Sequence, residues 1–140
     1  MKDGIIQLEG EAFKITSSLK ENDFLNSGIG QKAILSVKNE GYSSYTFGPY
    51  KIKSDNFYFL LIFYSGEIHS VYMELSDLND KIDYGADDKE SALIKANKIH
   101  ENWLLSNLGL PPYFYSWGSI DSAYDKKGWS AFIVLSYKQS

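Results

Sequence analysis

The side chains best suited to acid–base chemistry lie in the last third of the chain. His100 and Glu101 are adjacent, and Asp121 and Asp125 follow further along. General acid–base catalysis needs two titratable groups within hydrogen-bond reach of one substrate atom. The spacing does not bring these groups together, and Asp125 opens a predicted turn, where Asp is favoured for local hydrogen bonding. The sequence therefore assigns no catalytic residue, and we expect a protein that is not an enzyme.

Motifs for metals and cofactors fail on spacing. The histidines His69 and His100 match no zinc pattern, and the chain has no Cys. Gly28-Ile29-Gly30 precedes a predicted strand, whereas a phosphate-binding loop follows a strand, so we predict a plain turn. With Gly85 as the sixth residue of a calcium loop, Ile82 would be a ligand, so this pattern fails too. We expect no metal and no cofactor.

Length and composition bound the class of protein. The 140 residues contain no repeat or linker, which predicts a single domain, residues 1–140. The 14 basic residues are all Lys and the net charge is −4, which argues against nucleic acid because Arg provides the bidentate fork for phosphate and guanine. The longest apolar run, residues 57–64, is shorter than a membrane helix. Without a signal peptide or Cys, the expected location is cytoplasmic.

The elements that would position any site begin with strands. Residues 33–37 and 42–53 predict strands, and Gly48-Pro49 indicates a bulge or an edge because proline cannot donate to a ladder. Residues 57–75 predict a hairpin around the two-residue turn Ser65-Gly66. The strand 57–64 is apolar on both faces, so we expect it inside the sheet, covered by a helix on one face and by a second layer or a partner on the other. The turn predicts three cross-strand pairs: Tyr64 with Glu67, Ile62 with His69, and Leu60 with Val71.

A long helix is predicted for residues 87–108. Asp87 is the expected N-cap with Glu90 at capping-box spacing, and Gly109 with Pro111-Pro112 ends the helix. Its core stripe consists of Ala92, Ala96, Ile99 and Trp103, with Leu93, Leu104 and Leu108 beside it.

Residues 113–137 predict a C-terminal hairpin whose turn, Asp125 to Gly128, places Gly128 in the left-handed conformation. In the returning strand, one face carries Ala131, Ile133, Leu135 and Tyr137. The residues between them, some polar and some apolar, lie on the other face. The predicted fold is α+β: an antiparallel β-sheet with one long helix packed on one face, and the helix followed by a C-terminal β-hairpin.

The approach to the helix and its exit are the candidate binding surfaces. Residues 74–90 hold seven acids and two lysines, a local charge of −5, which fits either a solvated loop or a docking surface for a basic partner. After the helix, six aromatic residues in a short stretch exceed what one strand face can bury, so some are expected in an interface or groove, while Trp103 and Trp117 are expected in the core. The candidate partner-binding residues are Asp77, Asp80, Asp83, Tyr84, Asp87, Asp88, Tyr113, Tyr115 and Trp129.

The C-terminal part of the chain also carries a resemblance. The segments His100–Leu104, Leu108–Pro112, Tyr115–Asp121 and Tyr124-Asp125 look like a pattern in small bacterial proteins. The chain is similar to immunity proteins of contact-dependent growth inhibition and related polymorphic-toxin systems, which are short, acidic, cytoplasmic α+β proteins. The resemblance covers about the last 40 residues and the composition. That class shares no residue motif, so it assigns no residue. It implies a protein that binds and neutralises one cognate toxin.

Two other functions stay open. A small-ligand binding domain or assembly subunit would use a groove lined by the strand 57–64 and the aromatic hairpin. A hydrolytic enzyme would need at least two of His100, Asp121 and Asp125 in one cleft. The expected partner is a basic toxin domain, with the chain itself a monomer or homodimer.

Overall fold

The computed structural model describes residues 1–83, 85 and 88–139. This part of the chain has an α+β fold. Its elements are β1 (Ile6–Gln7), β2 (Lys14–Ile15), α1 (Glu21–Asn26), α2 (Gly28–Lys32), β3 (Ile34–Asn39), β4 (Tyr42–Ile52), β5 (Asp55–Tyr64), β6 (Glu67–Leu75), α3 (Leu78–Lys81), α4 (Lys89–Leu108), β7 (Tyr113–Tyr115), β8 (Gly118–Asp125) and β9 (Ser130–Tyr137). None of the described helices is long and apolar enough to cross a membrane.

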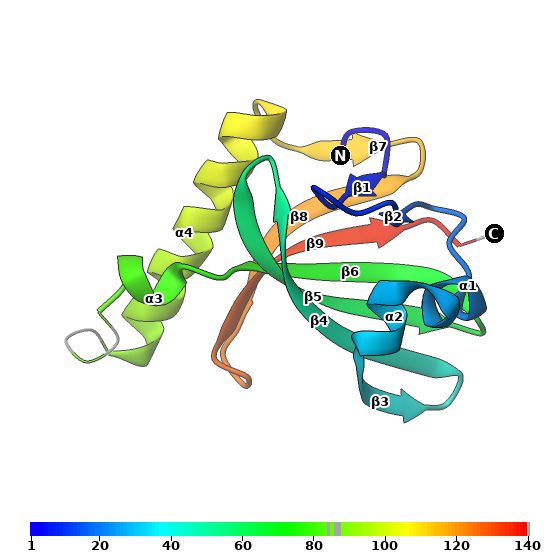
Figure 1. Ribbon diagram of the computed structural model, residues 1–140. Helices are drawn as coiled ribbons and strands as arrows, with labels where there is room; N and C mark the ends of the chain where they lie inside the picture. The colour runs from blue at the N-terminus through cyan, green and yellow to red at the C-terminus, as the bar shows by residue number, and fades with distance from the viewer. Residues whose placement is uncertain (84, 86–87, 140) are drawn as a thin grey trace.

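Seven of the strands form one antiparallel sheet in the order β3-β4-β5-β6-β9-β8-β7 (Figure 1). β1 and β2 form a separate two-stranded sheet. Helix α4 connects β6 to β7, and β9 returns to pair with β6. The C-terminal strands therefore extend the sheet that the first half of the chain begins. Three strands, β7, β8 and β9, follow the helix, whereas the sequence predicted a hairpin of two strands there.

One face of the sheet carries the core. On β5 the side chains of Phe57, Phe59, Leu61 and Phe63 are buried. Trp103 of α4 meets Phe57 edge-on, with ring centroids 5.0 Å apart. Phe24 of α1 packs on Phe63 of the same row at 5.8 Å. Thus α4 and α1 share this face, towards opposite ends of the sheet (Figure 1).

The opposite face, called the outer face below, carries the alternate side chains of the same strands. Leu60, Ile62, Tyr72 and Val134 lie on it, and all four are partly exposed. Strand β5 is therefore inside the sheet, as its two apolar faces predict. Neither α1 nor α4 covers these residues, since both pack on the core face.

The hairpin β5–β6 has the predicted turn but not the predicted register. Tyr64 pairs with Glu67 as expected, but Phe63 pairs with Ile68 and Ile62 with Ser70. His69 is thus an extra residue in a β-bulge, and Val71 lies opposite Leu61 on the core face. The predicted pairs of Ile62 with His69 and Leu60 with Val71 are wrong. A strand that is apolar on both faces does not specify register, so the bulge decided it.

The Asn26–Gly30 stretch, predicted as a turn, lies largely in helices. Ser27 separates α1 from α2, and its Oγ accepts a hydrogen bond from the Gly30 N–H at 2.9 Å. A Cβ on Gly30 would lie 1.7 Å from the carbonyl oxygen of Phe24. Glycine is therefore needed here so that the two short helices can approach each other. The expected bulge at Gly48-Pro49 is confirmed, because the register of β4 on β5 shifts between Phe47 and Tyr50.

Helix α4 begins at Lys89, with Asp88 as its N-cap. The Ser91 N–H donates to Asp88 Oδ1 at 2.8 Å. The predicted N-cap, Asp87, lies outside the described residues, but Asp88 holds the cap position. Gly109 follows the last turn with a φ of 84°, as predicted for a helix C-terminus. The predicted stripe is buried except for Ile99, which is partly buried, and His100 beside it is fully buried.

The turn between β8 and β9 differs from the prediction in its left-handed residue. Trp129 has a φ of 50°, and Gly128 is not among the positive-φ glycines. The alternation along β9 is confirmed, since Ala131, Ile133, Leu135 and Tyr137 are all buried.

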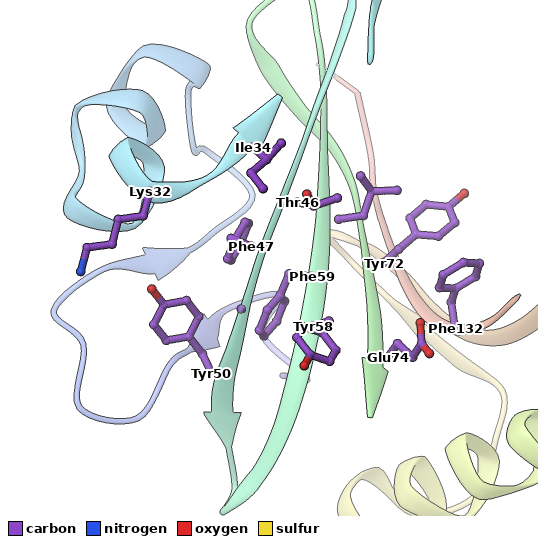
Figure 2. Close-up of a pocket in the computed structure, with 12 residues that line it drawn as sticks. Lys32, Ile34, Thr46, Phe47, Tyr50, Tyr58, Phe59, Tyr72, Glu74 and Phe132 are labelled. Carbon is purple, nitrogen blue, oxygen red and sulfur yellow. The ribbon is translucent and has the colours of Figure 1, made fainter. Parts of the chain in front are cut away.

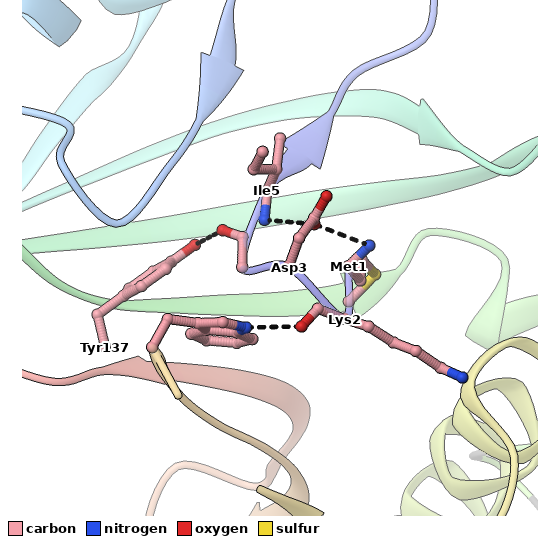
Figure 3. Close-up of polar contacts among 7 residues, drawn as sticks. Met1, Lys2, Asp3, Ile5 and Tyr137 are labelled. Atoms are coloured by element: carbon pink, nitrogen blue, oxygen red, sulfur yellow. Dashed lines mark hydrogen bonds and ion pairs between the residues drawn. The ribbon is translucent and has the colours of Figure 1, made fainter. Parts of the chain in front are cut away.

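The N-terminal residues are held against the last strands (Figure 3). The Tyr137 hydroxyl donates to the Gly4 carbonyl oxygen at 2.9 Å, and Trp117 Nε1 donates to the Lys2 carbonyl oxygen at 2.7 Å. The carboxylate of Asp3 accepts the Ile5 N–H, which lowers the pKa of Asp3. These contacts join the two ends of the chain.

Candidate functional site

The acidic stretch before α4 contains more structure than an exposed loop. α3 lies within it, and the side chains of Leu78 and Ile82 are buried. Asp77 forms an ion pair with Lys81 at 3.4 Å, while Asp80 and Asp83 are exposed. The predicted binding residues Tyr84 and Asp87 lie outside the described residues.

Trp129 is brought to the same end of α4 by the β8–β9 turn. The Lys89 ammonium lies 5.3 Å from the centroid of the Trp129 ring, and Lys126 forms an ion pair with Glu90 at 2.8 Å. The Trp129 side chain remains 48% exposed. An exposed aromatic residue therefore sits beside the acidic residues. This surface is called the acidic end below, and it consists of Asp77, Asp80, Asp83, Asp88, Glu90 and Trp129.

Two of the three predicted tyrosines, Tyr113 and Tyr115, lie at the other end of the helix and are not freely exposed. Tyr113 is 8% exposed and its hydroxyl donates to the Gly109 carbonyl oxygen at 2.8 Å. Tyr115 is partly buried and stacks on Trp117, with ring centroids 5.5 Å apart. The expected exposure of Tyr113 is wrong because β7 joins the sheet and pairs Tyr113 with the core residue Ile120. Of the predicted aromatic residues in the described part of the chain, only Trp129 has the expected exposure.

Of the four residues considered for acid–base chemistry, Glu101 and Asp121 line a common cavity, described below, whereas His100 and Asp125 lie elsewhere. His100 is enclosed between α4 and β6. Asp121 is exposed on β8, and Asp125 accepts the Lys127 N–H in the β8–β9 turn. Among the described residues, no group of three or more His, Cys, Asp or Glu side chains could hold a metal ion.

His100 has a structural role that the sequence did not predict. Its Nε2 accepts the Leu75 N–H at 3.1 Å, just beyond Met73, the last residue of β6 that pairs with β9. The imidazole thus replaces a strand partner where the two strands diverge. Burial lowers the pKa of His100 to about 4, so the ring is neutral and carries its proton on Nδ1. Nδ1 has no hydrogen-bond partner among the described residues.

The outer face contains a cavity of about 580 Å³, in the size range of small-molecule sites (Figure 2). It extends from Lys32 and Ile34 over β4, β5, β6 and β9, and two core residues, Phe47 and Phe59, also line it. Six of the residues on its wall are Thr46, Tyr58, Leu60, Tyr72, Glu74 and Phe132.

Glu74 is the unusual residue of this cavity. It is partly buried, and burial alone raises the pKa of its carboxyl group. Glu74 also lines a second cavity of about 310 Å³ together with Trp129 and Lys89, so the two cavities meet at this side chain. Sequence reasoning missed the site. The sequence did contain one signal, because Glu74 is the single acid on a face of β6 whose other side chains are hydroxyl and aromatic groups.

A third cavity of about 480 Å³ lies between the C-terminal half of α4 and the strands β7 and β8. Leu105, Leu110 and Phe114 line it and are exposed. It is an apolar groove with Glu101 and Asp121 on its wall.

Comparison with protein-family models, with curated proteins and with solved structures finds no match to this chain.

Proposed function

We propose that this chain is an immunity protein, an inhibitor that binds and neutralises a cognate bacterial toxin through the acidic end of α4. The observation that supports this proposal most is the position of Trp129. A residue far along the chain from the acidic stretch lies beside it, and nearly half of its side chain is exposed.

The two kinds of residue at the acidic end would act on different steps of binding. Carboxylates attract a basic partner before contact and raise the association rate. A rigid aromatic side chain buried in the complex slows dissociation. Lysines offset part of the charge, because Lys81 pairs with Asp77 and Lys126 with Glu90. Asp80 and Asp83 are exposed to solvent, and this exposure makes them the chief candidates for steering.

The test measures binding to the toxin domain encoded beside this chain's gene. We expect Asp80→Asn with Asp83→Asn to lower the association rate about tenfold at low salt and to flatten its salt dependence. We expect Trp129→Ala to raise the dissociation rate about tenfold or more, as loss of an interface anchor does.

Matched controls distinguish the surface from general effects. Glu11→Gln with Asp23→Asn removes the same charge from the N-terminal segment, and Phe114→Ala removes an exposed aromatic residue from the other end of α4. Both should leave the rates unchanged. Equal effects of test and control variants would contradict this interface, and the absence of any toxin gene beside this one would contradict the function.

The cavity on the outer face favours a second candidate, a small-ligand binding domain or assembly subunit. β5 and Phe132 of the C-terminal strands line this cavity, as this alternative requires. Stabilisation of the protein by members of a metabolite panel, in a thermal-shift assay, would support it.

A further inference from the structure

Among the described residues, the carboxylate of Glu74 has no charge partner. In residues 1–83, 85 and 88–139, no hydrogen bond and no ion pair involves the Glu74 carboxylate. Lys32 is the other charged residue on the wall of the cavity, at the end of α2, and it forms no ion pair with Glu74. A carboxylate withdrawn from water without compensation costs folding free energy. A positively charged ligand would offset that cost.

Aromatic side chains surround this carboxylate. Tyr58 is its direct cross-strand neighbour on β5, and Tyr72 lies two residues before it on the same face of β6. Phe132 of β9 meets Tyr72 edge-on, with ring centroids 5.2 Å apart. Figure 2 shows Glu74 on the same side of the cavity as Tyr72 and Phe132. Three rings from three strands thus line the cavity around one acid.

This combination has a defined chemical preference. Aromatic faces attract cations, and they do so most strongly for weakly hydrated organic cations such as quaternary ammonium groups. The partly buried carboxylate adds a direct charge attraction, which is stronger here than in open water. Leu60 and Ile34 supply apolar wall for an alkyl part of the ligand. The carboxylate disfavours an anion beside it, and neutral molecules would leave the carboxylate without a counterion.

We propose that the outer-face cavity binds a small organic cation, a molecule with one quaternary or protonated ammonium group and a short apolar part. Glu74 supplies the counter-charge, and Tyr58, Tyr72 and Phe132 supply the aromatic faces. The inference names the ligand class for the second candidate function and does not depend on toxin binding.

The test titrates small probes into the protein and measures binding by calorimetry and by amide chemical shifts. The probes are choline, tetramethylammonium and n-butylammonium, with 3,3-dimethylbutan-1-ol as the uncharged isostere of choline. We expect saturable binding of choline at millimolar concentration or below, with shifts at Tyr58, Tyr72 and Phe132. The isostere should bind at least about tenfold more weakly, since it lacks both the charge and the cation–π attraction.

A pair of variants isolates the carboxylate. Glu74→Gln keeps the shape of the side chain and should weaken choline binding at least about tenfold while leaving the isostere unaffected. Asp121→Asn removes an exposed carboxylate of β8 that does not line this cavity, and it should bind choline as the wild type does.

Three outcomes would overturn the proposal: equal binding of choline and its isostere, equal effects of the two variants, or no saturable binding of any cationic probe. Binding of the isostere would still support a ligand-binding function. Toxin binding that survives Glu74→Gln would leave the immunity proposal intact.

Discussion

At the scale of single residues, His100 couples the fold to pH. It is fully buried, and its Nε2 already accepts the Leu75 N–H. Protonation would remove that acceptor and place a charge in the core. Burial lowers the pKa of His100 from 6.5 to about 4. The unfolded chain therefore binds this proton at a higher pH than the folded chain does.

The contribution of His100 to stability is present above pH 6.5 and is lost as the pH falls towards 4. Between pH 7 and pH 4.5 the loss amounts to about 2–3 kcal/mol, because one pKa unit corresponds to about 1.4 kcal/mol and the titration of the folded chain is not complete at pH 4.5. In urea unfolding at about pH 7 and pH 4.5, we expect His100→Gln to lose less stability than the wild type by that amount. Glutamine can still accept the Leu75 N–H. His69→Gln, at a partly exposed position, serves as the control, and parallel pH profiles for all three proteins would contradict the assignment.

At the scale of elements, Trp103 fastens α4 to the β4–β5 hairpin. Its indole Nε1 donates to Asp55 Oδ2 at 2.8 Å, and its ring packs edge-on against Phe57. Asp55 is the first residue of β5. The side chain thus combines core packing with a directional contact that holds the helix at one place on the sheet.

A double-mutant cycle measures that directional contact. Trp103→Phe keeps an aromatic ring against Phe57 but removes the donor, and Asp55→Asn weakens the acceptor. We expect a coupling free energy of about 1 kcal/mol between the two substitutions in chemical denaturation. Asp55→Asn combined with Trp117→Phe should be additive, because Trp117 donates to the Lys2 carbonyl oxygen instead. Additivity in both cycles would show that the hydrogen bond from Trp103 contributes nothing to the free energy of unfolding.

At the scale of the whole molecule, the ends of the chain are packed together. The Tyr137 hydroxyl in the last strand donates to the Gly4 carbonyl oxygen, and Tyr137 is 5% exposed. Burial is the main reason that the pKa of Tyr137 is raised. The first residues thus cover a part of the core face that α4 does not reach.

Removing one hydroxyl tests this closure. Tyr137→Phe leaves the Gly4 carbonyl without its partner, and we expect a loss of about 1–3 kcal/mol in the free energy of unfolding. Amide exchange at Ile5 and Ile6 should become faster. Tyr124→Phe, at an exposed tyrosine, should change stability by less than about 0.5 kcal/mol. Unchanged exchange and stability in Tyr137→Phe would show that the N-terminal segment is held by other contacts.

Local chemistry made several features predictable. Gly109 ends α4 because glycine tolerates positive φ, and the alternation from Ala131 to Tyr137 identifies the buried face of β9. The helix N-terminus was predicted one residue early, because either of two adjacent Asp residues is suited to the N-cap position. The β5–β6 register was not predictable from residues that are apolar on both faces.

The candidate sites depended on contacts between distant segments. The sequence shows an acidic stretch and, far from it, Trp129, but only the packing of the β8–β9 turn on α4 brings them together. Likewise Glu74 and Tyr58 become neighbours only through the bulge at His69, which sets the register of β6 on β5.

By itself the sequence determined the α+β class and the position of the long helix, because both depend on composition and on periodicity within short segments. The tertiary structure decided which face of each strand is open, which aromatic residues stay exposed, and that His100 is fully buried and Glu74 partly buried. Burial and pairing are sums over segments far apart in the chain. A one-residue shift of any strand would turn its buried side chains to the opposite face of the sheet. The order of residues alone therefore does not determine burial or strand pairing.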